Sequence, residues 1–308
     1  MNNFSRKIVM KRYLVLLLAI GILATAAEAK KWRAKHVVVI GIDGWGAYSV
    51  PKAQDIPNIR SLMDSGCYSL TKRSVLPSSS AINWASMFNG APTEMHGYTQ
   101  WGSKRPDIPS MTTNSHGIFP TVFSILREQY PDVVTACIAE WDGIKHLVDT
   151  LAINNYDVAA NYKNDDEQLT RMAEEYIRTK RPTLMAVCYD QVDHVGHHVG
   201  HDTPDYYKVL SHIDRQVGRI VQALKDAGIY DDTIILMTAD HGGKEKGHGG
   251  QSLLEMEIPF IICGKGIKRL GKIDDVIMQY DTAATIAEIF RLKRPQAWRG
   301  VPIWSVFK

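Results

Sequence analysis

The residues best suited to bind a metal lie in the glycine-rich stretch 237–250. Asp240 and His241 directly follow an apolar run, and His248 comes seven residues after His241. Neutral imidazole and carboxylate groups are both ligands of zinc and similar divalent ions. The surrounding glycines allow the backbone to approach a bound group closely. Taken alone, the stretch is also compatible with a surface loop that carries two ordinary histidines.

A second group of this kind occupies residues 190–201, where four histidines and two aspartates follow another apolar run. Asp193 and His197 stand four residues apart, a spacing that places both on one face of a helical turn. A solvated histidine-rich loop is the alternative. Such a cluster is poor material for a core, and its position at a strand end favours a metal site.

Asp43 follows the continuous apolar run 36–42. An acidic residue at the carboxyl end of a buried parallel strand lies on the rim where open α/β sheets bind ligands. Asp43 and Gly44 also form a common turn pair, so this stretch alone supports either interpretation.

Three consecutive serines, Ser78, Ser79 and Ser80, precede an apolar helix predicted over 81–88 and closed by Gly90. Serine before such a run is a helix N-cap signal, and at least one of the three should have that role. A hydroxyl at this position can also point into an anion site, because the N-terminal end of a helix is positive.

The candidate ligands and serines lie between buried strands and amphipathic helices, which alternate along the chain and must position them. The pattern predicts an α/β fold: a mainly parallel central sheet sandwiched by helices, in a single domain. Strands are expected over 36–42, 67–76, 133–139, 183–189, 233–239 and 258–263, and helices over 56–65, 81–88, 119–129, 165–180, 206–227 and 281–292. Residues 91–118 are expected to form a long loop or a small insertion; its Trp101, Lys104 and Arg105 could contact a substrate, but a solvated loop is the favoured interpretation. Residues 140–143 follow a second strand end and are candidates to line the pocket.

Three aspartates, Asp43, Asp193 and Asp240, therefore each follow a separate buried strand, and histidines accompany the last two. Together they supply six oxygen and nitrogen ligands, enough for two metals of open coordination. Two divalent ions a few ångströms apart clamp the attacking and leaving oxygens of an in-line phosphoryl transfer.

The assembled pattern resembles the alkaline phosphatase superfamily, in particular its type I phosphodiesterase and nucleotide pyrophosphatase branch. The resemblance covers nearly the whole chain after residue 30. It is carried by residues 41–44, 193–200, 240–242 and 247–249, and by residues 280–287, which look like the C-terminal helix of that family.

The resemblance implies specific roles. Asp193, His197 and His248 would hold one zinc, and Asp43, Asp240 and His241 the other. Ser80 would be the nucleophile and a ligand of the second metal. Asn83 would donate a hydrogen bond to a phosphoryl oxygen. The nucleophile of the family lies three residues before an asparagine and ten before a glycine, and Ser80 satisfies both spacings with Asn83 and Gly90.

The sequence departs from the family pattern at the nucleophile. The resembling diesterases usually carry threonine there, whereas serine is typical of the monoesterase branch. The sulfatase branch needs a Cys/Ser-x-Pro-x-Arg motif, which this sequence lacks. A formylglycine sulfatase is therefore not expected.

Residues 1–29 read as a signal peptide. Four Lys/Arg residues precede the apolar run 13–27, and Ala27 and Ala29 suit a signal-peptidase site. That segment holds four basic residues and one acidic residue, so residues 30–308 carry 32 of each sign. A nucleic-acid-binding surface is not expected from this balance. The alternative for residues 1–29 is a retained membrane anchor.

We therefore expect a phosphodiesterase domain over 30–308, exported to the periplasm or the extracellular space. It should hold two divalent metal ions, most plausibly zinc, and act on small-molecule phosphate esters. A phosphomonoesterase at the same site is the first alternative. The second alternative is an exported protein that binds metal or phosphate without turnover. Such a binding protein needs no nucleophile at a helix start, so the role of Ser80 distinguishes it from an enzyme. The four cysteines are expected to be small core residues rather than a disulfide framework.

Overall fold

The computed structural model describes residues 31–159 and 166–308. The predicted signal peptide therefore lies outside the described residues. The chain divides into a short unit, Met1–Trp32, and a second unit, Arg33–Lys308, which contains the sheet and the helices that cover it. Among the described residues, no helix combines the length and the apolar character that a membrane crossing requires.

The second unit is built on one eight-stranded sheet with the order β4-β3-β5-β1-β6-β7-β2-β8. The strands are β1 (His36–Ile42), β2 (Gly66–Arg73), β3 (Thr135–Ala139), β4 (Asn155–Val158), β5 (Leu184–Tyr189), β6 (Thr233–Thr238), β7 (Glu257–Gly264) and β8 (Gly271–Lys272). Strand β7 runs antiparallel to both of its neighbours, while the other pairs are parallel. The expected mainly parallel sheet is confirmed. Strands β4 and β8 were not expected.

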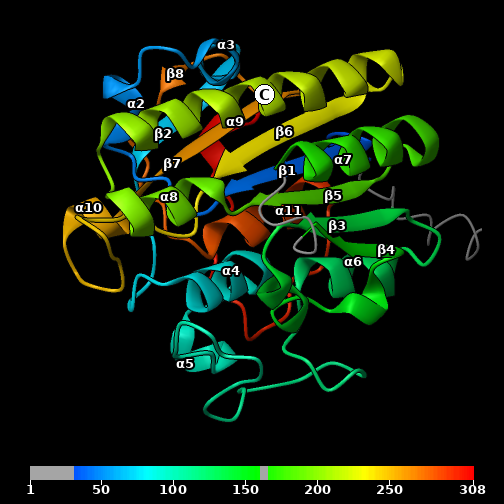
Figure 1. Ribbon diagram of the computed structural model, residues 1–308. Coiled ribbons are helices and arrows are strands. Elements are labelled where there is room, and N and C mark those ends of the chain that lie inside the picture. Colours follow the sequence, from blue (N-terminus) through cyan, green and yellow to red (C-terminus); the bar gives the residue numbers. More distant parts are fainter. Residues whose placement is uncertain (1–30, 160–165) are drawn as a thin grey trace, which may run out of the picture. The chain divides into compact units, whose positions relative to one another are not determined.

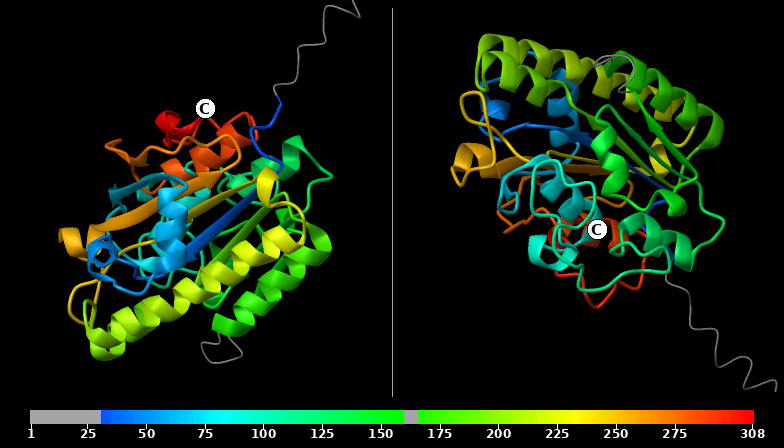
Figure 2. Two further views of the ribbon diagram at one scale, coloured as in Figure 1. Left: turned by 90° about the horizontal axis from the view of Figure 1, so that it is seen from above. Right: turned by 60° about the horizontal axis from the view of Figure 1, so that its bottom comes forward.

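Helices cover both faces of the sheet (Figure 1). Helices α3 (Pro57–Asp64), α7 (Asp166–Lys180) and α9 (Pro204–Asp226) pack on one face, and α4 (Ser80–Asn89), α6 (Val122–Gln129) and α11 (Asp281–Ile289) lie on the other (Figure 2). Shorter helices are α2 (Ser49–Lys52), α5 (Thr93–His96), α8 (Gln191–Val199) and α10 (Leu253–Met256), with 3₁₀ turns at Asp142–His146, Thr150–Ala152, Tyr230–Asp232 and Trp304–Val306.

Local sequence explains where the main helices begin. Thr203 caps α9 by accepting a hydrogen bond from the Tyr206 N–H, and Pro204 occupies the first turn, where its missing N–H costs nothing. The apolar stripe of α9 then packs into the core between the sheet and helices α3 and α7. Four free cysteines are buried, as expected for small core residues.

The three central strands bring the predicted metal ligands together. Strand β1 lies between β5 and β6 and is parallel to both, so their carboxyl ends meet at one edge of the sheet. Asp43 follows β1, Asp193 lies in the first turn of α8 just after β5, and Asp240 follows β6. This edge is where open parallel sheets bind ligands.

Candidate metal centre and nucleophile

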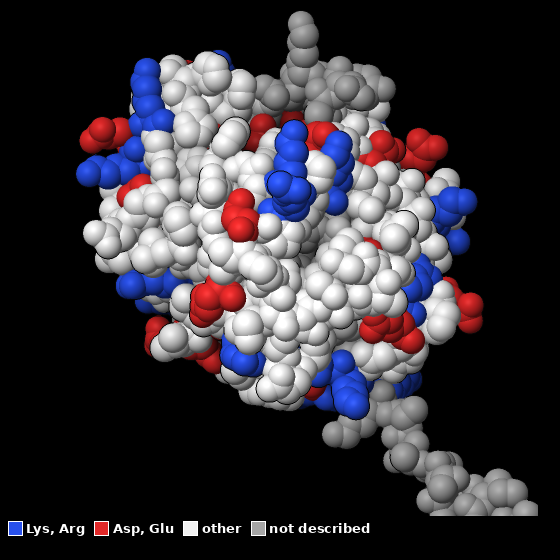
Figure 3. Space-filling model, turned by 90° about the horizontal axis from the view of Figure 1, so that it is seen from below, with Lys and Arg blue, Asp and Glu red and all other residues white. Residues whose placement is uncertain are grey.

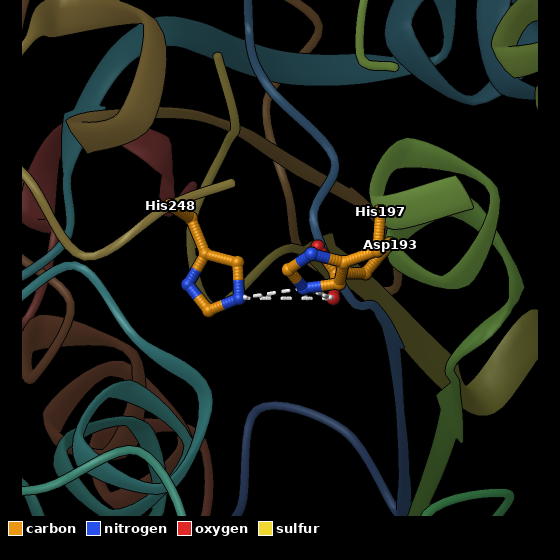
Figure 4. Close-up of side chains that lie close together, drawn as sticks. All are labelled: Asp193, His197 and His248. Carbon is orange, nitrogen blue, oxygen red and sulfur yellow. Dashed lines mark hydrogen bonds and ion pairs between the residues drawn. The ribbon is translucent and has the colours of Figure 1, made fainter. Parts of the chain in front are cut away.

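Asp193, His197 and His248 form the first group that could hold a metal ion. Helix α8 presents Asp193 and His197 on one face, with Nε2 of His197 3.0 Å from Oδ2 of Asp193. The loop after β6 brings Nε2 of His248 to 3.1 Å from Nε2 of His197 and 3.8 Å from Oδ2 of Asp193 (Figure 4). One carboxylate and two imidazoles therefore converge on one point.

Asp43, Asp240 and His241 form the second group, and all three are buried. Nε2 of His241 lies 3.4 Å from Oδ1 of Asp43 and 3.2 Å from Oδ2 of Asp240. Within the described part of the chain, these same two oxygens are buried and accept no hydrogen bond. Buried carboxylate oxygens without partners are costly, and a divalent cation between them would satisfy both. The side chains present therefore fit a metal.

The three histidines are held in the same orientation by backbone carbonyls. Nδ1 of His241 lies 2.7 Å from the Gly242 carbonyl, Nδ1 of His197 2.9 Å from that of Lys246, and Nδ1 of His248 3.2 Å from that of Ser78. A donating Nδ1–H directs Nε2 toward the group centre in each case. Metal-ligating histidines are commonly fixed in this way by a partner at the other ring nitrogen.

The carboxylates also have fixed partners. The Trp84 indole donates to Oδ2 of Asp43 at 3.0 Å, and the N–H groups of Gly44 and His241 donate to Oδ1 of Asp240. Each aspartate thus keeps its other oxygen for a ligand. A tryptophan inside an apolar helix indicates core packing and nothing more, so the hydrogen bond from Trp84 to Asp43 could not be predicted from the sequence.

Ser80 lies beside the second group. It is the first residue of α4, and its Oγ is 3.1 Å from Nε2 of His241. Ser79 is the N-cap residue of α4, and its Oγ lies 3.5 Å from Nδ1 of His248. Ser78 donates to the Gly250 carbonyl and so holds the metal-binding loop. The three adjacent serines thus have different surroundings, and Ser80 is the one whose hydroxyl contacts the second group.

Asn83 is fully buried, and its amide faces the loop before α4. Its Oδ1 accepts from the Val75 N–H at 2.7 Å, and its Nδ2 donates to the carbonyls of Val75, Pro77 and Ser79. In this arrangement Asn83 holds the segment that leads to Ser80. Its expected contact with a phosphoryl oxygen stays a prediction.

A family model for type I phosphodiesterase / nucleotide pyrophosphatase matches residues 37–248, which include both ligand groups and Ser80. The chain belongs to this family. The family match supports hydrolysis of phosphoric esters as the general class of reaction.

Curated relatives match in part. Mouse ectonucleotide pyrophosphatase/phosphodiesterase family member 3 is 23% identical over 67% of this chain and 24% of its own length. Human family member 5 is 35% identical over 22% of this chain and 14% of its own length. The human GPI ethanolamine phosphate transferase 2 catalytic subunit is 27% identical over 53% of this chain and 17% of its own length. The chain thus spans less than a quarter of the length of these relatives.

Solved structures confirm the fold of the family. An inactive variant of murine ectonucleotide pyrophosphatase/phosphodiesterase 5, in complex with AMP, superposes with a TM-score of 0.70 at 15% identity, covering 89% of this chain and 100% of that one. A 2-O GAG sulfatase superposes with a TM-score of 0.71 at 14% identity, covering 88% of this chain and 73% of that one. At these identities the likeness defines the fold alone.

Burial and neighbouring charges shift the pKa values of residues in both groups. Burial, reinforced by neighbouring carboxylates, raises the pKa of Asp43 well above its usual range and that of Asp240 to about 7. Burial lowers the pKa of His248 to about 4. The hydrogen bond to Asp193 raises the pKa of His197 to about 9, so its Nε2 carries a proton that a metal would displace.

A cleft of about 200 Å³ opens next to these groups. Besides Ser80, its lining includes five residues outside both groups: Trp101, Trp141, Asp190, His194 and His198. Trp141 follows β3 as the sequence indicated, and Trp101 lines the cleft although a solvated loop was favoured for its segment; Lys104 and Arg105 are not in the lining. On the face shown in Figure 3, acidic and basic side chains are interspersed rather than gathered by sign.

Proposed function

We propose that this protein is a secreted two-zinc hydrolase that cleaves phosphodiester or pyrophosphate bonds through a phosphoserine intermediate on Ser80. The observation that carries the proposal is the position of the Ser80 hydroxyl. It lies 3.1 Å from Nε2 of His241, lines the cleft and is attached to the first turn of α4. A pure binding protein has no need of a nucleophile there.

Asp193, His197 and His248 would hold one ion, and Asp43, Asp240 and His241 the other, with Ser80 as an additional ligand of the second. Bound divalent ions would supply Lewis-acid stabilisation of the phosphoryl oxygens and a lowered pKa for a hydroxyl or water. Ser80 gives up its hydroxyl proton to solvent as Oγ attacks phosphorus in line, so that the Oγ–P bond forms while the P–O bond to the leaving group breaks and that oxygen takes up a proton from water. Water then attacks phosphorus, and the Oγ–P bond breaks to release the product. The N–H groups at the start of α4 favour the negative charge of the phosphoryl group during both steps.

The charge of the cleft favours a diester over a monoester. Among the described residues that line it, none is Lys or Arg, and Lys104 and Arg105 are exposed and lie outside the lining. A monoester dianion carries one more charge than a diester and needs extra cationic groups to bind it. The alternative of a phosphomonoesterase is favoured by the identity of the nucleophile, serine in place of threonine.

One experiment compares these reactions directly. Purified protein loaded with zinc should hydrolyse bis(4-nitrophenyl) phosphate faster than 4-nitrophenyl phosphate, and 4-nitrophenyl sulfate should be inert. The sulfate arm is needed because sulfatases share this fold, although the chain lacks their nucleophile motif. Faster turnover of the monoester would replace the diesterase proposal. Turnover of none of the three would favour a binding protein without catalysis.

A further inference from the structure

A buried glutamine, Gln279, joins the helix that carries Ser80 to the loop that carries Asp240. Gln279 lies two residues before α11 and is fully buried. Its Nε2 donates to the Asn83 carbonyl at 3.2 Å and to the Ala239 carbonyl at 3.0 Å. Asn83 belongs to α4, which begins at Ser80, while Ala239 lies between β6 and Asp240. One amide group therefore bridges the nucleophile's helix and the segment of the second metal group.

The orientation of this amide is fixed, because both of its partners are carbonyl oxygens. Carbonyls accept hydrogen bonds and cannot donate them, and only the NH2 end of a glutamine carries donors. Each N–H of Nε2 therefore serves one carbonyl. At the other end of the amide, Oε1 of Gln279 is buried and accepts no hydrogen bond from the described residues. An unsatisfied buried acceptor is destabilising, so the contribution of this side chain lies in its two donated bonds.

The segment that carries Gln279 is itself held firmly. Oδ2 of Asp281 accepts a hydrogen bond from the Met278 N–H at 2.7 Å. The Arg73 N–H donates to the Ile277 carbonyl at 2.9 Å, which attaches the segment to the end of β2. Gln279 thus extends from a fixed support and does not simply follow the two segments that it joins.

A buried lysine adds a second link between α11 and the end of β6. Nζ of Lys72 donates to Oγ1 of Thr238 at 2.8 Å and to Oγ1 of Thr282 at 2.7 Å. Thr238 is the last residue of β6, and Thr282 lies in the first turn of α11. Helices α4 and α11 also pack against each other on the same face of the sheet (Figure 1). The start of α11 is therefore a common support for the strand end and the nucleophile's helix.

Loss of the bridging amide would leave two buried carbonyls directed at the same space. Both oxygens carry partial negative charge and would lack a donor, so they would move apart or admit water. The segments behind them hold the 3.1 Å contact between Oγ of Ser80 and Nε2 of His241. A displacement of about 1 Å at reacting groups can cost about a hundredfold in rate.

We propose that Gln279 is a positioning residue that sets the distance between Ser80 and the second metal group. This inference rests on the proposed function, since it concerns the attack by the Ser80 hydroxyl. Gln279 is buried outside the cleft and takes no part in bond making or breaking. It acts through Ser80, because it holds α4 where that hydroxyl reaches His241.

Gln279→Met removes the donated bonds with little change in shape, because methionine is also unbranched and carries no donor. In the zinc-loaded protein, kcat for bis(4-nitrophenyl) phosphate should fall about tenfold or more, while KM stays within about twofold. Gln279→Asn keeps an amide on a side chain too short to bridge both carbonyls, so its kcat should lie in between. Circular dichroism and Tm verify that each variant is folded at the assay temperature.

A double-mutant cycle with Ser80→Ala separates positioning of the nucleophile from general support of the fold. If Gln279 acts by placing the Ser80 hydroxyl, it has no further effect on hydrolysis once that hydroxyl is absent. Gln279→Met should therefore change the residual rate of the Ser80→Ala protein by less than about twofold. Equal losses of rate in the presence and in the absence of the Ser80 hydroxyl would overturn the positioning role.

Zinc affinity gives a readout that does not depend on turnover. Ser80 is a proposed ligand of the second ion, so displacement of α4 should weaken zinc binding about tenfold in a competition titration with a chromogenic chelator. The same Gln279→Met change should leave the zinc affinity of the Ser80→Ala protein unaltered. Gln279→Asn replaces Gln279→Met in both cycles if the methionine variant does not fold.

Gln216→Met is the matched control. Gln216 is also a buried glutamine, but its side chain bonds to His212 and Arg219 within α9, on the opposite face of the sheet. This variant should leave kcat, KM and zinc affinity as in the parent protein. A folded Gln279→Met protein with the kcat and zinc affinity of its parent overturns this inference and leaves the proposed function intact. Absence of hydrolysis of bis(4-nitrophenyl) phosphate by the parent protein overturns the proposed function itself.

Discussion

The Ser80 hydroxyl lies 3.1 Å from Nε2 of His241, although 161 residues separate them in the sequence. Helix α4 supplies the serine from one face of the sheet, and the end of β6 supplies the histidine. Nδ1 of His241 donates to the Gly242 carbonyl, so Nε2 carries a lone pair that accepts from the serine. The proposed nucleophile is therefore in direct contact with a proposed metal ligand.

Ser80→Ala should abolish turnover of bis(4-nitrophenyl) phosphate while the fold and most of the bound metal remain. Loss of a covalent nucleophile typically costs about a thousandfold or more, with a residual rate from the remaining site. Ser80→Thr should keep appreciable activity, because threonine offers the same hydroxyl. Steady-state rates, circular dichroism and metal analysis test all three statements.

Ser79→Ala is the matched control, since Ser79 is the N-cap residue and its Oγ is 3.5 Å from His248. A Ser80→Ala protein as fast as its parent would contradict the assignment. If Ser79→Ala were then inactive, Ser79 would be the nucleophile.

The purified protein should carry about two divalent ions per chain, as two-metal hydrolases do. His248→Ala should remove about one ion from the first group and Asp43→Asn about one from the second. Elemental analysis after dialysis gives the count. The ligand assignment would fail if both variants retained the metal content of the parent.

Gly44→Ala should lower metal affinity. Gly44 has φ of +66°, and a Cβ there would lie 2.5 Å from Oδ1 of Asp193. The substitution therefore adds a collision with a metal-binding carboxylate to the backbone strain of a left-handed residue.

Gly228→Ala separates the two effects, because Gly228 has φ of +68° and nothing within 4 Å of the added Cβ. Both variants should lose about 1 kcal/mol of stability from strain, but only Gly44→Ala should bind zinc more weakly in a competition titration with a chromogenic chelator. Equal zinc affinities in the two variants would argue against the collision.

The metal-free protein should lose stability as pH rises from 7 to 9. Folding raises the pKa of His197 to about 9, so the folded state binds more protons than the unfolded state between pH 7 and 9. The raised pKa of Asp240, about 7, has the same effect mainly below pH 7. The stability from such groups is present below their unfolded pKa values and is lost as pH passes the folded ones. The pKa of His248 is lowered to about 4, so its effect on stability falls below pH 7 and outside this window.

Thermal unfolding after chelation should therefore give a falling Tm between pH 7 and 9, and His197→Gln should reduce the slope. Added zinc should raise Tm more at pH 9 than at pH 7, because binding displaces the His197 proton. A Tm that rises with pH in the metal-free protein would contradict the charge arrangement.

Export should leave Lys30 as the first residue, because Ala27 and Ala29 fit the small pockets of signal peptidase. N-terminal sequencing of protein recovered outside the cytoplasm checks the cleavage position. Recovery of a chain with residues 13–27 intact in the membrane fraction would show the retained anchor instead.

The class of fold and the candidate ligands could both be predicted from local patterns of residues. Runs of β-branched residues as in 36–42 specify buried parallel strands, and Asp43, Asp193 and Asp240 come soon after such strands. Parallel strands place their carboxyl ends on one edge, so the convergence of these residues follows from local patterns and one topological rule. The spacing of Asp193 and His197 likewise predicted the shared face that α8 shows.

Local patterns could not predict which oxygens of Asp43 and Asp240 lack a hydrogen-bond partner, or which groups each of the three adjacent serines contacts. Residues 78–80 carry the same side chain, and sequence spacing said nothing about the backbone groups that Ser78 and the Asn83 amide contact. The hydrogen bond from Trp84 to Asp43 and the antiparallel direction of β7 also depend on packing between segments that are distant in the sequence. Which side chains form hydrogen bonds depends on distances of a few ångströms between packed helices and strands. The periodicity of residues along one helix or strand does not specify those distances.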